Sequence, residues 1–139
     1  MLPYLFFSRL YKLKCCNQNI ISLYDQMDSE DESIQNICAK RLEVRRMIKT
    51  ELSESLDKVR NENRSAAEKP IIYLISEAIM GGFKLMLLCQ RKNWQGLYKC
   101  ELHNLSLYYN ALYTPNAPKE IIDSLLTQKN RIEDYMIDA

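Results

Sequence analysis

A cysteine and the only histidine of the chain, Cys100 and His103, come closest to a chemical motif. Their three-residue spacing puts both side chains on one side of a helix, and thiolate and imidazole are ligands that zinc accepts. Cys89 would be a third ligand. Three ligands of unspecified geometry make a weak metal site, and a histidine that packs beside a cysteine or faces water is the simpler interpretation. We therefore expect no metal site and no bound cofactor.

Motifs that identify enzymes are missing from the sequence. It has no glycine-rich phosphate loop, no GxSxG nucleophile motif, no HExxH zinc motif and no CxxC pair. With a single histidine, catalysis by a histidine pair within one chain is excluded. The sequence predicts a protein that is not an enzyme, with no catalytic residue and no small-molecule substrate.

Two arginines, Arg41 and Arg45, interrupt an apolar pattern. At about 100° per residue, both lie within about 20° of the centre of the apolar stripe that runs from Ile34 to Val59. A guanidinium group does not enter a core unpaired. Three interpretations are open: the alkyl stems pack while the charged heads reach water, one arginine pairs with Glu77, or the stripe receives an acidic partner or phosphates.

The same segment carries a basic cluster, which makes nucleic-acid binding the alternative function. Five positive charges fall within ten residues: Lys40, Arg41, Arg45, Arg46 and Lys49. Glu43 and Glu51 dilute this charge, and the acidic residues between 28 and 32 lie one or two turns away. The net charge of +1 predicts no general attraction to nucleic acid or to acidic membranes.

Aromatic residues gather between positions 94 and 113. One helical face is expected to pack into the core, and it carries Trp94, Tyr98, Leu105, Tyr109 and Leu112. Tyr108 and Tyr113 are then left at its exposed edge. Tyrosine and tryptophan are favoured at interfaces, because they bury large rigid areas and keep a polar group. We expect the following residues to form a contact for a protein partner or a second copy of the chain: Trp94, Tyr98, Tyr108, Tyr109, Tyr113, Arg41 and Arg45.

Helices must position these residues, because three glycines and four prolines are too few for a strand-rich fold. The most apolar stretch, 71–89, carries only Glu77 and Lys84 as charges and predicts a central, largely buried helix. Its length is near the lower limit for a membrane span, but two charges make insertion close to neutral or unfavourable. The sequence predicts an all-α, single-domain bundle of four to five helices.

The other helices are expected at three places in the chain. A capping box at Ser29 to Glu32 predicts the start of a long helix. Either this helix runs on to about residue 63 and projects into a partner, or it breaks near Thr50 to Ser55. Residues 94–113 and 118–136 predict two more helices with a turn at 114–116. The predicted domain spans 29–139.

An N-terminal segment, 1–28, is basic and apolar and predicts a short helix that ends at Cys15 and Cys16. Three interpretations are open. The helix lies on an anionic membrane with palmitate on the cysteine pair, it folds onto the bundle as a first helix, or the segment is a frayed tail. An odd number of cysteines, five, at irregular spacing and without a convincing signal peptide, predicts reduced thiols and a cytoplasmic location.

The sequence favours a non-enzymatic protein-binding regulator, inhibitor or adaptor. Its richness in Asn, Lys, Ile, Leu and Tyr is typical of an AT-rich genome. This favours the hypothesis of a viral, phage or mobile-element accessory protein.

Overall fold

The computed structural model describes residues 2–27, 31–62 and 94–137. Within these ranges the chain forms four α-helices and no strand: α1 (Leu2–Asp25), α2 (Glu32–Glu62), α5 (Trp94–Leu112) and α6 (Lys119–Ile137). The prediction of an all-α fold is confirmed for this part of the chain. The predicted central helix, 71–89, lies outside the described residues.

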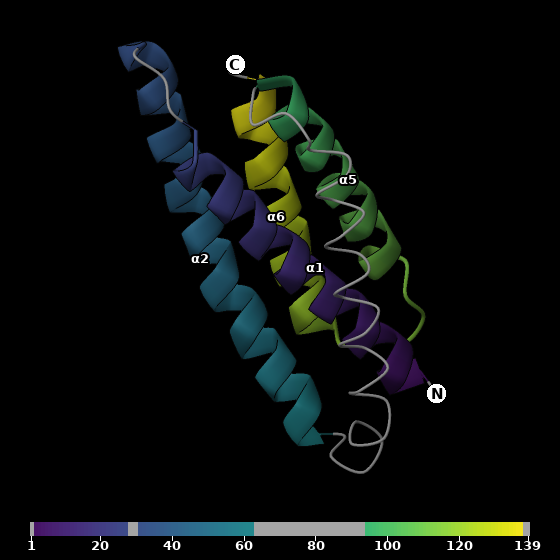
Figure 1. The fold of residues 1–139 in the computed structure, drawn as a ribbon. Coiled ribbons are helices and arrows are strands. Elements are labelled where there is room, and N and C mark those ends of the chain that lie inside the picture. Colours follow the sequence, from purple (N-terminus) through teal and green to yellow (C-terminus); the bar gives the residue numbers. More distant parts are fainter. Residues whose placement is uncertain (1, 28–30, 63–93, 138–139) are drawn as a thin grey trace.

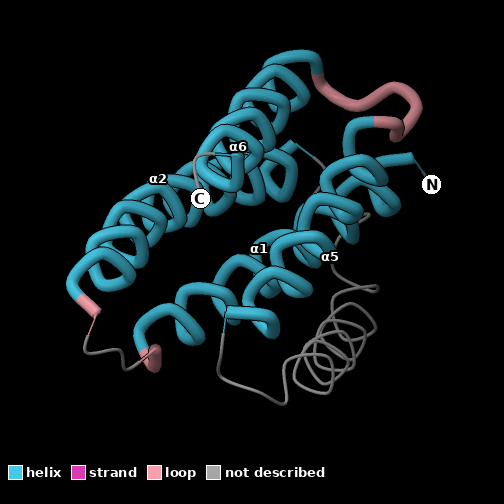
Figure 2. Tube along the Cα trace, turned by 90° about the horizontal axis from the view of Figure 1, so that it is seen from above, coloured by secondary structure: helices cyan, strands magenta, loops and turns pink. Residues whose placement is uncertain are grey.

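The four helices pack in two layers, with α1 beside α5 and α2 beside α6 (Figures 1 and 2). Contacts between elements close a ring: α1 touches α2 and α5, and α6 touches the same two helices. The axis of this ring is therefore a place where side chains from all four helices can meet.

The long helix α2 is continuous from Glu32 to Glu62, with no break at the predicted position. Its 31 residues correspond to about 46 Å. Asp31 supplies the N-cap, because its Oδ1 accepts hydrogen bonds from the Ser33 amide at 2.9 Å and the Ser33 hydroxyl at 2.8 Å. The predicted cap residue, Ser29, lies outside the described residues.

The N-terminal helix α1 is 24 residues long and continues well past the predicted end at Cys15 and Cys16. Its buried face includes Phe6, Phe7 and Leu10 near the start, and it is prolonged by Ile20 and Tyr24. The first group belongs to the same core as buried residues of α2, α5 and α6. Of the three interpretations, the structure shows a first helix that folds onto the bundle.

None of the helices in the described ranges is long and apolar enough to cross a membrane.

The connection between α5 and α6 is a tight turn, as predicted. Asn116 has φ 59°, a left-handed conformation that asparagine tolerates. Arg9 of α1 ties this turn to the bundle, because its Nη1 donates to the Thr114 hydroxyl at 2.8 Å and to the Asn110 carbonyl at 2.9 Å. The helix bounds on either side differ from the prediction by one residue.

Candidate binding site

A buried polar network occupies the axis of the bundle, and Arg45 of α2 is at its centre. This side chain is fully buried. It forms an ion pair with Glu101 of α5 through Nη2 and Oε2. Nη1 donates to the amide oxygens of Asn17 at 3.0 Å and Asn104 at 2.8 Å, and Nε donates to the Tyr135 hydroxyl at 3.0 Å. One guanidinium group thus connects α2 to the other three helices.

The carboxylate of Glu101 is equally well held. Besides the ion pair, its Oε1 accepts hydrogen bonds from the hydroxyls of Tyr24 at 2.7 Å and Tyr135 at 2.5 Å. Burial raises the pKa of both phenols, and the negative charge of Glu101 adds to the rise. Burial is the largest single influence on the pKa of Arg45 and would lower it, but Glu101, Tyr135 and other neighbouring groups together outweigh burial, so the pKa lies above its ordinary value.

Arg41, one helical turn before Arg45, is the second buried cation. Its Nη1 donates to the Tyr24 hydroxyl at 3.1 Å, and its Nη2 donates to the Tyr135 carbonyl at 3.2 Å. The guanidinium carbon is 5.1 Å from the ring centroid of Trp94 and 4.9 Å from that of Tyr135. Both distances fit cation–π contacts. Nε is buried and finds no acceptor among the described residues.

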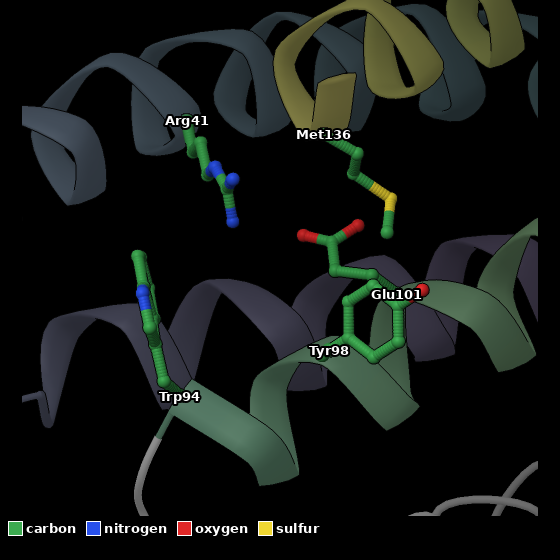
Figure 3. A pocket seen from close by; sticks show the side chains of 5 residues that line it. All are labelled: Arg41, Trp94, Tyr98, Glu101 and Met136. Atoms are coloured by element: carbon green, nitrogen blue, oxygen red, sulfur yellow. The ribbon is translucent and has the colours of Figure 1, made fainter. Parts of the chain in front are cut away.

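A pocket of about 210 Å³ opens beside Arg41. Its lining comes from three helices: Arg41 of α2, Trp94, Tyr98 and Glu101 of α5, and Met136 of α6 (Figure 3). The indole of Trp94 stands next to the guanidinium group, and Met136 and the Glu101 carboxylate lie across from them. This pocket joins aromatic and thioether surface to a buried cation.

The sequence correctly placed Arg41 and Arg45 on the buried stripe of the long helix. The interpretation that their charged heads reach water is wrong, because the side chains are 7% and 0% exposed. Arg45 pairs with a carboxylate, as one interpretation required, but the partner is Glu101. Glu77 lies outside the described residues.

The buried face of α5 differs from the predicted one. The residues that pack into the bundle are Leu97, Cys100, Glu101, Asn104, Tyr108 and Ala111. Tyr108, expected at an exposed edge, is fully buried and donates to Gln128 Oε1 at 2.8 Å. Because Glu101 and Asn104 are polar, apolar periodicity did not identify this face of α5 as the buried one.

Another face of α5 exposes large apolar side chains. Tyr98, Tyr109 and Tyr113 are 57%, 47% and 78% exposed, and Leu102, which sequence reasoning missed, is 46% exposed. Trp94 is half-buried. A 4-3-4-3 spacing unites five positions, which we call the outer seam: Tyr98, Leu102, Leu105, Tyr109 and Leu112. Of the predicted partner-binding residues, the structure therefore leaves Tyr98, Tyr109 and Tyr113 accessible and buries Tyr108, Arg41 and Arg45.

The predicted basic cluster on α2 is divided between the interior and the surface. Arg41 and Arg45 are inside the bundle, whereas Lys40, Arg46 and Lys49 are exposed. One of these three, Arg46, has a carboxylate oxygen of Asp25 at 3.6 Å. Three exposed cations with Glu43 beside them form a much weaker phosphate-binding surface than five.

The cysteines are in two redox states. Cys15, Cys16 and Cys38 are free, whereas Cys100 is disulfide-bonded. The expectation of reduced thiols is therefore wrong at Cys100, because pairing depends on proximity in the fold, which spacing does not encode. The described ranges hold no group of three or more His, Cys, Asp or Glu side chains placed to bind a metal ion.

No family model, curated protein or solved structure matches this chain. Its function has to be inferred from the arrangement of its own residues.

Proposed function

We propose that this chain is a non-enzymatic regulator or adaptor that binds an amphipathic α-helix of a partner protein along the outer seam of α5. The observation that supports this most directly is the second apolar face of that helix. Three seam residues, Tyr98, Leu102 and Tyr109, are about half exposed, although a neighbouring face of the same helix already packs into the bundle and Leu105 and Leu112 pack partly against its core. Apolar surface of this extent on one helix favours a binding role.

The spacing of the seam specifies the shape of the occupant. Apolar residues four and then three apart are the a and d positions of a heptad repeat, and such a seam packs against another helix. From Tyr98 to Leu112 the seam is about 21 Å long. Its centre is about 110° around the helix from the centre of the buried face, so a second helix can lie there beside the bundle.

The charges beside the seam favour a partner protein over a second copy of this chain. Lys99 is exposed directly next to Tyr98 and has no ion-pair partner in the described part of the chain. The only acidic residue of α5, Glu101, is buried, so two α5 helices facing each other bring no carboxylate to Lys99. A partner helix with an acidic residue at this flank would supply one.

Synthetic helical peptides test this proposal with the full chain. One peptide carries leucine at every a and d position and glutamate at the flanks, the second has lysine at the flanks, and the third has the same composition in scrambled order. We expect fluorescence anisotropy to show that the first peptide binds best. Leu102→Ala should cost about 2 kcal/mol or more of binding and leave thermal stability nearly unchanged.

Leu126 of α6 provides the matched control, because it is 44% exposed, as Leu102 is 46% exposed. Leu126→Ala should change neither binding nor stability. If Leu102→Ala lowers stability and leaves binding intact, the seam packs within its own chain and the proposal is wrong. Self-association that depends on Leu102 would mean that the seam binds a second copy of this chain and not a partner protein. Binding to duplex DNA that weakens steeply with salt and requires Lys40 would favour the nucleic-acid alternative.

A further inference from the structure

We propose that the pocket beside Arg41 binds a small organic monoanion, a carboxylate with a compact apolar body. The outer seam is not required for this role, although Tyr98 belongs to both. The proposal rests on a charge excess, on unused hydrogen-bond donors and on the chemistry of the pocket wall.

The charge excess comes from the buried network. Arg41 and Arg45 contribute two positive charges, and Glu101 contributes one negative charge, which Arg45 pairs directly. No carboxylate in the described ranges lies within ion-pair distance of Arg41. A buried, uncompensated charge is unfavourable, and an anion that enters the pocket removes the imbalance.

The unused donors are those of Arg41 itself. A guanidinium group has five N–H donors. Arg41 uses two of them, toward the Tyr24 hydroxyl and the Tyr135 carbonyl. Both acceptors are neutral, so the strong charge-assisted hydrogen bonds that an anion offers are not yet made. Since Arg41 lines the pocket, an anion there has direct access to this group.

The pocket wall sets the size and body of the ligand. Trp94, Tyr98 and Met136 provide aromatic and thioether surface, which suits an apolar group attached to the anion. The volume of about 210 Å³ is below the range of about 300 to 1,000 Å³ that is usual for drug-sized ligands. Nucleotides and large cofactors are therefore too big.

Glu101 limits the charge of the ligand. Its carboxylate also lines the pocket, and it is held by Arg45, Tyr24 and Tyr135. One negative charge on the ligand balances the excess of the network, whereas a second one would be repelled by Glu101. A monocarboxylate is thus favoured over a phosphate dianion. A small cation could contact the aromatic wall, but the charge of Arg41 opposes it.

The single tryptophan of the chain, Trp94, reports directly on this pocket. Titration of the full chain with benzoate at constant ionic strength should change Trp94 fluorescence in a saturable way. Benzamide, which has the same shape without the charge, should bind much more weakly, as should inorganic phosphate. Arg41→Gln should weaken benzoate binding by about tenfold or more.

Arg46→Gln is the control for net charge, since Arg46 is on the same helix but exposed, and it should bind benzoate as the unchanged chain does. Met136→Phe, which fills the pocket and keeps Arg41, should abolish binding even where Arg41→Gln fails to fold. Equal affinity for benzamide and benzoate, or equal losses in Arg41→Gln and Arg46→Gln, would overturn the proposal. So would saturable binding of tetramethylammonium in place of benzoate, or no saturable signal with any carboxylate.

Discussion

Arg45 and Glu101 form an ion pair in which both side chains are completely shielded from solvent. The two residues come from α2 and α5, which face each other across the ring of helices. Removal of two charges from water is costly, and the pair is stable only because both groups also make further hydrogen bonds. Asn17, Asn104 and Tyr135 do this for Arg45.

Loss of one partner of this pair should be strongly destabilising. Glu101→Gln leaves the Arg45 charge buried without a counterion, and we expect the free energy of unfolding to fall by about 3 to 5 kcal/mol. Urea denaturation followed by circular dichroism measures this change. The matched control is Glu51→Gln, which removes a partly exposed pair with Arg131 and should cost about 1 kcal/mol or less. Similar losses in the two variants would mean that the buried pair contributes no more than a surface pair.

Replacement of both Arg45 and Glu101 should lower the free energy of unfolding by less than the sum of the two single replacements. In Arg45→Leu with Glu101→Leu no charge is left unpaired, so the double variant should be more stable than additivity predicts. A double-mutant cycle measures the coupling. Additive losses would contradict a direct interaction between the two side chains.

Tyr108 should respond to substitution as a core residue. Tyr108→Phe removes the hydroxyl that donates to Gln128 Oε1 and leaves a buried acceptor unsatisfied, with an expected cost of about 1 to 3 kcal/mol. Tyr113, 78% exposed, offers the comparison: Tyr113→Phe should change the thermal midpoint very little. A larger loss of stability in Tyr113→Phe than in Tyr108→Phe would contradict the burial of Tyr108 and favour the buried face that the hydrophobic pattern predicted for α5.

The N-terminal helix should contribute to stability as part of the core. Leu10 is fully buried among residues of the other helices, so Leu10→Ala should lower the free energy of unfolding by about 2 to 5 kcal/mol. Leu5, on the same helix but 38% exposed, provides the control, and Leu5→Ala should cost clearly less. Nearly equal small effects would mean that α1 packs only loosely on the bundle.

Stability should fall in alkaline solution. Burial raises the pKa of the Cys16 thiol from 9.0 to about 11. Between these values the unfolded chain releases the thiol proton while the folded chain keeps it, so stability decreases as pH rises through this window. One such group gives a slope of about 1.4 kcal/mol per pH unit. Burial likewise raises the pKa of Tyr24 and Tyr135, which extends the loss beyond the ordinary tyrosine range.

The urea midpoint measured from pH 8 upward, with and without Cys16→Ala, tests the thiol contribution. The variant should show a shallower decline between pH 9 and pH 11. If the urea midpoint falls with pH at the same slope in both proteins, the loss of stability comes from the tyrosines and not from the Cys16 thiol.

The elements whose buried face is mostly apolar were predictable, although Gln128 of α6 is also buried. In α6, Ile121, Leu125 and Ile132 follow helical spacing, and the predicted ends differ by one residue. The arginines of α2 were also found by angle alone, because the apolar residues around them define the stripe clearly. Periodicity gave these results because each helix carries the information in its own sequence.

The buried face of α5 could not be found in this way. Glu101 and Asn104 are buried only because Arg45, more than fifty residues earlier, meets them at the axis of the bundle. No pattern within residues 94–112 indicates that Arg45 is the partner of these two side chains. The pocket was missed for the same reason, since Arg41, Trp94 and Met136 come from three different helices.

The central polar network also fixes how far each helix extends along its neighbours. Apolar stripes alone can slide past one another by a turn and still bury similar surface. In this bundle a one-turn slip would carry Glu101 about 5.4 Å along the axis, away from Arg45, and would leave two charges in the interior without partners. The network thus favours one longitudinal alignment of the four helices over the others. The exposed residues of α5 are therefore held at one fixed height relative to the pocket.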